Sequence, residues 1–289
     1  MRSLTIGTRA KYCRSRKVPK TADIAVDRSE GSAIRQLVPF RARVEARVLV
    51  RRLRDAFSHE RFAGARSSDE ASFPYPVFSH RARLVRDYPE PWYSLQQNKI
   101  ANLAIAVNAI DRLTISPSES FSFWRLLGRT SRRKGYLPGM TIVDGRLAVA
   151  AGGGLCQLSN ALYWVALHLG YTISERHRHS FDCFPDSYRS VPFGAGATVN
   201  YNYVDLRFRN ESDETYRIRA WLDEEYLHVE AFADRRPRYR YRVIEENHRL
   251  SSQLRENDLV RLCLDGDSVI SREKIAHNEG RLLYSTLDG

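Results

Sequence analysis

Apolar residues recur at helical spacing in three parts of the chain. They predict helices over residues 40–57, 95–113 and 158–169, and the last pattern stops at Gly170, a residue typical of helix C-termini. The first of these patterns is rich in arginine, which is typical of a helix that docks on its own domain or lies on a membrane surface. Four prolines between residues 64 and 94 predict a loop there.

Alternating apolar and polar positions predict strands in the second half of the chain. The alternation over 171–181 places His177 and His179 on the same face as apolar residues. Further strands are expected at 140–143, 146–151, 197–208, 216–222 and 226–232, with short ones near 239–244 and 259–264. The order of elements predicts an α+β fold, with helices on the N-terminal side packed on a mainly antiparallel sheet.

The pattern divides the chain into four parts. We expect a disordered basic leader (1–30), a basic helical and loop extension (31–90), a core domain (91–235) and a C-terminal extension (236–289). The net charge is +12, and residues 1–90 hold 20 Lys or Arg against 10 Asp or Glu, so this first third carries +10 of it. Such a segment is either a solvated leader or an arm that contacts acidic lipid.

The sequence also excludes several classes of protein. The basic N-terminus lacks the apolar segment of a signal peptide, and no 18-residue apolar run exists, so we expect a cytoplasmic protein with peripheral membrane contact through its basic N-terminal region. No nucleic-acid-binding motif occurs, so no nucleic acid partner is expected. The four cysteines, Cys13, Cys156, Cys183 and Cys263, form no CxxC pair, which argues against a zinc ribbon and a disulfide scaffold.

Cys156 stands where a glycine-rich turn meets a predicted helix, in the run Gly152-Gly153-Gly154-Leu155-Cys156-Gln157. Unpaired backbone N–H groups and the helix dipole favour a thiolate at such a position. The glycines let the backbone approach a substrate carbonyl, so the N–H groups from Gly153 and Gly154 to Gln157 are candidates for binding an oxyanion. The alternative is a tight turn beside a small buried thiol.

The segment Arg176-His177-Arg178-His179 supplies the candidate proton carriers. Either histidine is suited to take the thiol proton, and a carboxylate such as Asp182, Asp186 or Glu175 is suited to orient it. Arg176 and Arg178 offer planar donor forks for a substrate carboxylate. A zinc site built from both histidines with Cys156 or Cys183 is the alternative; we expect no metal and no cofactor.

Several longer motifs resemble the VanW family, most strongly between about residue 90 and residue 235. The motifs are Asn98-Lys99-Ile100-Ala101-Asn102-Leu103, Phe121-Ser122-Phe123-Trp124, Gly152 to Asn160, Glu175 to His179, Phe184-Pro185-Asp186 and Ala197-Thr198-Val199. Many family members have an aspartate before Ala-Thr-Val, where this chain has Gly196. If that aspartate orients the histidine, Asp182 or Asp186 must replace it here.

The resemblance implies a link to cell-wall metabolism or glycopeptide resistance. Some clostridial proteins with VanW domains are reported as L,D-transpeptidases, which crosslink peptidoglycan stem peptides through an enzyme thioester. The family cysteine then corresponds to Cys156, and the paired histidines to His177 and His179, with a peptidoglycan stem peptide or precursor as partner. The alternative is a non-catalytic protein that binds cell-wall precursors or a resistance partner, with structural or zinc-binding Cys and His.

Overall fold

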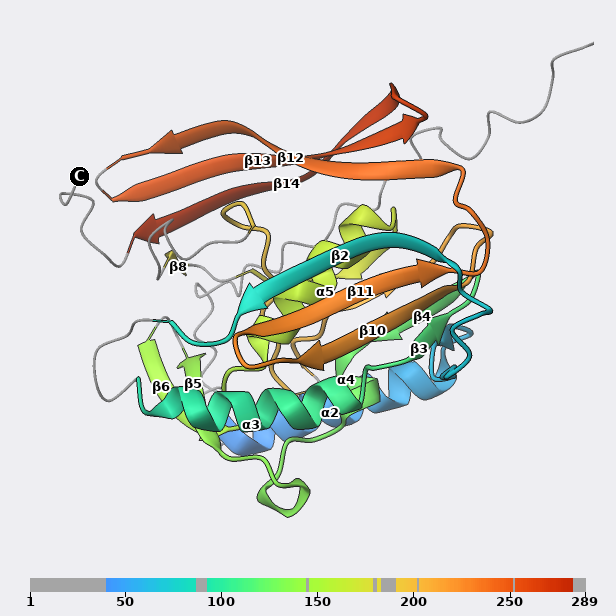
Figure 1. The fold of residues 1–289 in the computed structure, drawn as a ribbon. Helices are drawn as coiled ribbons and strands as arrows, with labels where there is room; N and C mark the ends of the chain where they lie inside the picture. The colour runs from blue at the N-terminus through green and yellow to red at the C-terminus, as the bar shows by residue number, and fades with distance from the viewer. Residues whose placement is uncertain are drawn as a thin grey trace, which may run out of the picture.

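The computed structural model describes residues 40–86, 93–143, 146–178, 181–182, 191–201, 203–251 and 253–282 (Figure 1). The predicted leader at 1–30 lies outside these ranges, as do His179, Cys183 and Asp186. Of Asp182 only the backbone is described, in the two-residue strand β8 (Phe181–Asp182).

The three predicted helices are confirmed, and the second ends at Asn108 instead of residue 113, where a strand begins. They are α2 (Phe40–Phe57), α3 (Leu95–Asn108) and α5 (Cys156–His168), and short helices occur at α4 (Phe123–Leu127) and η1 (Arg132–Lys134). Most residues of α5, from Leu158 to His168, are buried on every side except at Asn160. A helix that is buried all round lies inside the fold, and α5 is the central element of the core.

Three four-stranded sheets surround this helix. Their orders are β2-β11-β10-β3, β1-β4-β9-β7 and β12-β13-β14-β8, and β5 and β6 form a separate hairpin. The strands of the first sheet are β2 (Tyr75–Arg83), β11 (Tyr226–Ala233), β10 (Tyr216–Leu222) and β3 (Leu113–Ile115). Those of the second are β1 (Arg61–Phe62), β4 (Glu119–Ser122), β9 (Arg207–Arg209) and β7 (Thr172–Glu175).

The third sheet is formed by the end of the chain. It consists of β12 (Tyr239–Leu250), β13 (Leu254–Asp265), β14 (Ser268–Leu282) and β8, while the hairpin pairs β5 (Pro138–Val143) with β6 (Arg146–Ala151). α5 contacts β2 and β11 of the first sheet and β12 of the third, so it lies between these two sheets (Figure 1). Most strand pairs are antiparallel, and the α+β prediction is confirmed.

The loop predicted over residues 64–94 is wrong in part, because Tyr75–Arg83 form the strand β2. Pro76 lies within this strand, opposite Phe232, where the register shifts. β2 is at the edge of its sheet, and proline is tolerated in an edge strand because one side of the strand needs no backbone hydrogen bond. The prolines therefore indicated an edge strand that the sequence pattern could not distinguish from a loop.

Two other strand predictions differ from the structure in length. The strand predicted over 171–181 ends at Glu175, and the strand predicted over 197–208 is reduced to β9. The C-terminal strands are much longer than the short ones predicted. β12 and β14 show many exposed side chains, and polar residues on the exposed face concealed their apolar face.

None of the helices within the described residues combines the length and the apolar character needed to cross a bilayer. The cytoplasmic location stays a prediction.

Candidate active site

Close backbone packing fixes the glycine loop that precedes α5. Gly153 is buried against the carbonyl of Gly139 in β5, and a Cβ at this position would overlap that backbone. Gly154 has a φ of +93° and packs against the aliphatic stem of Lys99 on α3. A side chain is excluded there by the backbone conformation and also by the lack of space. The loop is therefore held between the hairpin and α3, and it delivers Cys156 to a fixed position.

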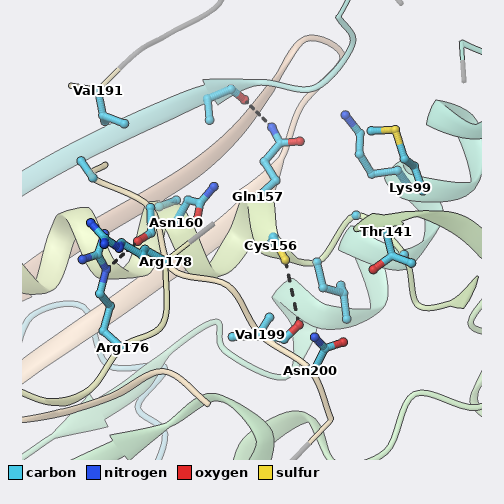
Figure 2. Close-up of a pocket in the computed structure, with 18 of the residues that line it drawn as sticks. Lys99, Thr141, Cys156, Gln157, Asn160, Arg176, Arg178, Val191, Val199 and Asn200 are labelled. Carbon is cyan, nitrogen blue, oxygen red and sulfur yellow. Dashed lines mark hydrogen bonds between the residues drawn. The ribbon is translucent and has the colours of Figure 1, made fainter. Parts of the chain in front are cut away.

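Cys156 is the first residue of α5, and it is half-buried at the wall of a cavity of roughly 300 Å³ (Figure 2). Its Sγ lies 4.0 Å from the carbonyl oxygen of Val199. Burial raises the pKa of the thiol. The N-terminus of α5 favours the thiolate less than burial disfavours it. The resting group is therefore a neutral thiol, which needs a proton acceptor before it can act as a nucleophile.

The first turn of α5 also binds the segment that faces the thiol. The Ser159 hydroxyl donates to the carbonyl of Ala197 at 2.6 Å, and the Ala197 N–H donates to Asn160 Oδ1 at 2.7 Å. A Cβ at Gly196 would stand 3.0 Å from the same Asn160 oxygen. Gly196 therefore lies against Asn160.

His177 belongs to a charged network outside the cavity. Its Nε2 lies 3.0 Å from Glu175 Oε1, and it is absent from the residues that line the cavity. Burial alone would raise the pKa of the Glu175 carboxyl, but hydrogen bonds from His177 and Arg51 outweigh it and bring that pKa down to about 2. Glu175 is one of the carboxylates expected to orient the histidine, and it does contact His177. The carbonyl of His177 accepts the N–H of Thr198, which precedes the Val199 carbonyl that faces the thiol.

The remaining predicted residues are His179, the second candidate proton carrier, and Asp186, a candidate carboxylate for orienting the histidine. Both lie outside the described residues, so their roles stay predictions.

The predicted substrate-binding residues line the cavity, but most of their polar groups are engaged. Arg176 donates from Nε to the Gly196 carbonyl at 2.9 Å and from a terminal nitrogen to Gly194. Gln157 donates to the carbonyl of Arg83 at 2.8 Å, which ties α5 to β2, and its N–H donates to Gly154. Arg178 is exposed and donates to the carbonyl of His277 at 3.2 Å.

Two residues whose pKa is lowered by burial, Lys99 and His80, line the cavity and are missing from the sequence prediction. Lys99 on α3 is buried and its Nζ donates to the carbonyl of Leu84. Burial, with a smaller effect of the Arg86 charge, lowers the pKa of Lys99 to about 7. Burial likewise lowers the pKa of His80 on β2 to about 4, with the nearby His168 contributing.

A signal for Lys99 did exist in the pattern of α3. Gln96, Lys99 and Asn102 recur at three-residue spacing and all three are buried, which makes a polar stripe on a helix that also packs apolar residues. Asn102 donates to the Gly153 carbonyl at 3.0 Å and accepts from the Leu137 N–H at 2.8 Å, so this stripe faces the glycine loop. Buried polar residues need hydrogen-bond partners. The three-residue spacing was therefore the signal that marks the face of α3 directed toward the site.

Basic side chains predominate around the cavity. The lining includes His80, Arg86, Lys99, Arg176 and Arg178, with Glu279 of β14 as an acidic member. A concave site lined mainly by one sign of charge concentrates ligands of the opposite sign. The cavity is therefore suited to an anionic ligand such as one bearing a carboxylate.

A group of side chains on β13 and β14 has the geometry of metal ligands. Ligand atoms of Glu256, His277 and Glu279 lie within 4.8 Å of one another. Exposed carboxylates often gather in this way without an ion, and we assign no metal to them. The alternative zinc site of the sequence analysis involves His179 and Cys183, which lie outside the described residues, and His177, which contacts Glu175.

Comparison with known proteins identifies the family. A family model described as VanW like protein matches residues 98–232. The vancomycin B-type resistance protein VanW of Enterococcus faecalis is 36% identical over 179 residues, which span 62% of this chain and 65% of that protein. The uncharacterized protein YoaR of Bacillus subtilis is 35% identical over 130 residues, 44% of this chain and 40% of YoaR.

The chain thus spans less than two thirds of the length of these relatives. No solved structure matches the chain significantly. The region matched by the family model contains most of α3, the glycine loop, Cys156 and α5, so the cavity is built largely from that region. Over residues 98–232 the protein therefore belongs to the VanW family.

Proposed function

We propose that this protein uses Cys156 for acyl transfer on peptidoglycan stem peptides, in the manner of an L,D-transpeptidase. The observation that carries the proposal is the position of the thiol. It stands at the first residue of a buried helix, in the wall of a cavity that also contains an amine with a pKa near neutrality. Family membership and the basic lining support a substrate with peptide carboxylates.

The neutral thiol and the buried lysine have complementary roles in this proposal. With a pKa of about 7, Lys99 is partly unprotonated at neutral pH. Its Nζ donates to the Leu84 carbonyl, so in this proposal it accepts the Cys156 proton through water in the cavity that both residues line. The thiolate then attacks an amide carbonyl carbon of the stem. The C–N bond breaks, the leaving amine takes the proton back from Lys99, and a thioester remains on Cys156.

The second half of the reaction reverses these proton movements. The amine of a neighbouring stem attacks the thioester carbonyl and loses a proton to Lys99, and Cys156 leaves as a thiol. The result is a new amide bond with no net change in protons. Water in place of the amine would give peptide hydrolysis at the same site.

The exposed guanidinium of Arg178 lies at the cavity wall and is suited to bind a stem carboxylate. Arg176 is engaged with the carbonyls of Gly194 and Gly196 and stacks over Tyr163 at 5.1 Å. We therefore assign Arg176 to shaping the cavity and Arg178 to substrate contact.

A binding function without catalysis is the second candidate. Two observations favour it: burial raises the pKa of the Cys156 thiol, and His177 is not among the residues that line the cavity with that thiol. In this case the basic cavity would recognise a cell-wall precursor, and Cys156 would only pack the start of α5.

Mass spectrometry of the intact protein after incubation with tetrapeptide and pentapeptide stems distinguishes the two candidates. Acyl transfer predicts that the wild type gains the mass of the stem without its leaving amine, that Cys156→Ala gains none, and that Cys263→Ala, whose cysteine is buried in β13, gains the same mass as the wild type. Binding of either stem by calorimetry, with no adduct and no released product, would refute acyl transfer and support the binding function.

A further inference from the structure

The helix α2 presents its apolar side to solvent. Its exposed large side chains are Leu49 at 58%, Val50 at 55%, Leu53 at 49% and Phe57 at 82%. Positions i, i+1, i+4 and i+8 of a helix lie on one face, so these four side chains form a continuous stripe, called here the α2 stripe. A stripe of this kind normally faces the core of a protein.

Ion pairs hold the opposite face of α2 on the core. Asp55 accepts two hydrogen bonds from Arg207, at 2.8 and 2.7 Å, and the exposed fractions of the two side chains are only 11% and 8%. Arg51 pairs with Glu175, with one bond of 2.8 Å. The helix cannot roll to bury its stripe without leaving these charges unpaired, which is costly for partly buried ions.

Cations lie along the sides of the α2 stripe. Arg47 and Arg54 are exposed on α2, and Arg132 and Arg133 of η1 are exposed a few residues beyond Arg129, which pairs with Glu45 of the same helix. An apolar stripe with flanking arginines is typical of a helix in the plane of an anionic lipid surface. A second copy of the chain fits less well, since a symmetric contact would bring like charges together.

We propose that the α2 stripe inserts into the interface of an anionic membrane, with the flanking arginines near the lipid headgroups. In Figure 1, α2 runs along the side of the molecule opposite to β12, β13 and β14, so the core can rest on a bilayer without involving the C-terminal sheet. This inference is independent of the reaction proposed for Cys156.

Sedimentation of the full chain with lipid vesicles tests the proposal. Vesicles of phosphatidylglycerol mixed with phosphatidylcholine are compared with vesicles of phosphatidylcholine alone. The test variant combines Leu49→Ser, Leu53→Ser and Phe57→Ser. The matched control combines Val149→Ser, Val269→Ser and Ile270→Ser, which change exposed apolar residues elsewhere.

The proposal predicts binding to the anionic vesicles by the wild type and the control. The test variant should bind at least about ten-fold more weakly, because three apolar side chains no longer enter the interface. Thermal unfolding should be the same in all three proteins, since every changed side chain is exposed. Arg47→Gln with Arg54→Gln should weaken binding and reduce its dependence on salt.

Two results would overturn the proposal. Equal binding by the test variant and the wild type would show that electrostatic attraction of other basic residues is sufficient. Absence of wild-type binding to anionic vesicles, together with self-association that the test variant abolishes, would instead identify the stripe as an interface between two copies.

Discussion

Replacing Lys99 by methionine tests whether the cavity holds an amine whose charge is destabilised by burial. The side chain is only 7% exposed, and burial lowers its pKa from 10.5 to about 7. Between these two values the unfolded chain binds the proton more tightly than the folded protein does. The loss of folding stability caused by burying the charged amine is therefore complete below pH 7. Stability is regained as the pH rises toward 10.5.

The size of the effect follows from the two pKa values. Each unit of difference corresponds to about 1.4 kcal/mol, and integrating the proton uptake of both states from pH 7 to pH 9 gives a gain of about 2 kcal/mol in wild-type stability. Methionine has nearly the same length and no titratable group, so the variant lacks this gain. The difference in unfolding free energy between wild type and variant should rise by the same amount.

Urea unfolding at pH 7, 8 and 9, followed by tryptophan fluorescence, measures this difference. The buried Trp124 and Trp164 provide the signal. Burial also raises the pKa of Cys156 and Tyr216, but both groups are present in wild type and variant, so their effects cancel in the difference. Lys134→Met is the matched control, because Lys134 is exposed and also donates to a backbone carbonyl, that of Leu127 at 3.1 Å.

Parallel pH profiles for the wild type and Lys99→Met would refute the reasoning. They would show that the amine keeps its ordinary pKa in the folded protein. Lys99 would then be almost fully protonated at pH 7 and unsuited to accept the Cys156 proton. A steeper wild-type profile that Lys134→Met preserves and Lys99→Met abolishes is the result we expect.

Two other substitutions test the packing around the site. Gly153→Ala should destabilise the protein by about 1–3 kcal/mol and slow alkylation of Cys156, since a Cβ overlaps the Gly139 carbonyl. The control Gly64→Ala, which has open space around it, should change stability by less than about 0.5 kcal/mol. Equal urea midpoints for the two variants would contradict this. Arg207→Met should cost about 3–5 kcal/mol in urea unfolding, because its carboxylate partners lose their cation; wild-type stability would show that those carboxylates find other partners.

The local patterns were reliable guides where one segment determines its own structure. The apolar stripe of α5 and the glycine turn before it come from neighbouring residues, and both are confirmed. The strands expected at 140–143 and 146–151 are confirmed as β5 and β6 for the same reason. Patterns failed where a partner strand decides the outcome, as in β2, whose Pro76 is acceptable only because the strand lies at a sheet edge.

The candidate site divides in the same way. The sequence by itself determined the family, the helix that begins at Cys156 and the glycines that position the thiol, because these depend on short continuous motifs. Only the tertiary structure decided which titratable groups share the cavity with that thiol. Lys99 and His80 reach it from α3 and β2, while His177, much nearer in sequence, is held by Glu175.

Tertiary structure likewise reversed the meaning of the pattern in α2. Its residues are arranged as in an ordinary amphipathic helix, yet the side that meets the core carries Arg51 and Asp55 as well as the buried Val48, because Glu175 and Arg207 supply partly buried charges for the two ionic residues. Burial, pKa and the direction in which a helix faces all depend on neighbours from distant parts of the chain. The sequence pattern shows that such a face exists, and the packed structure decides what it contacts.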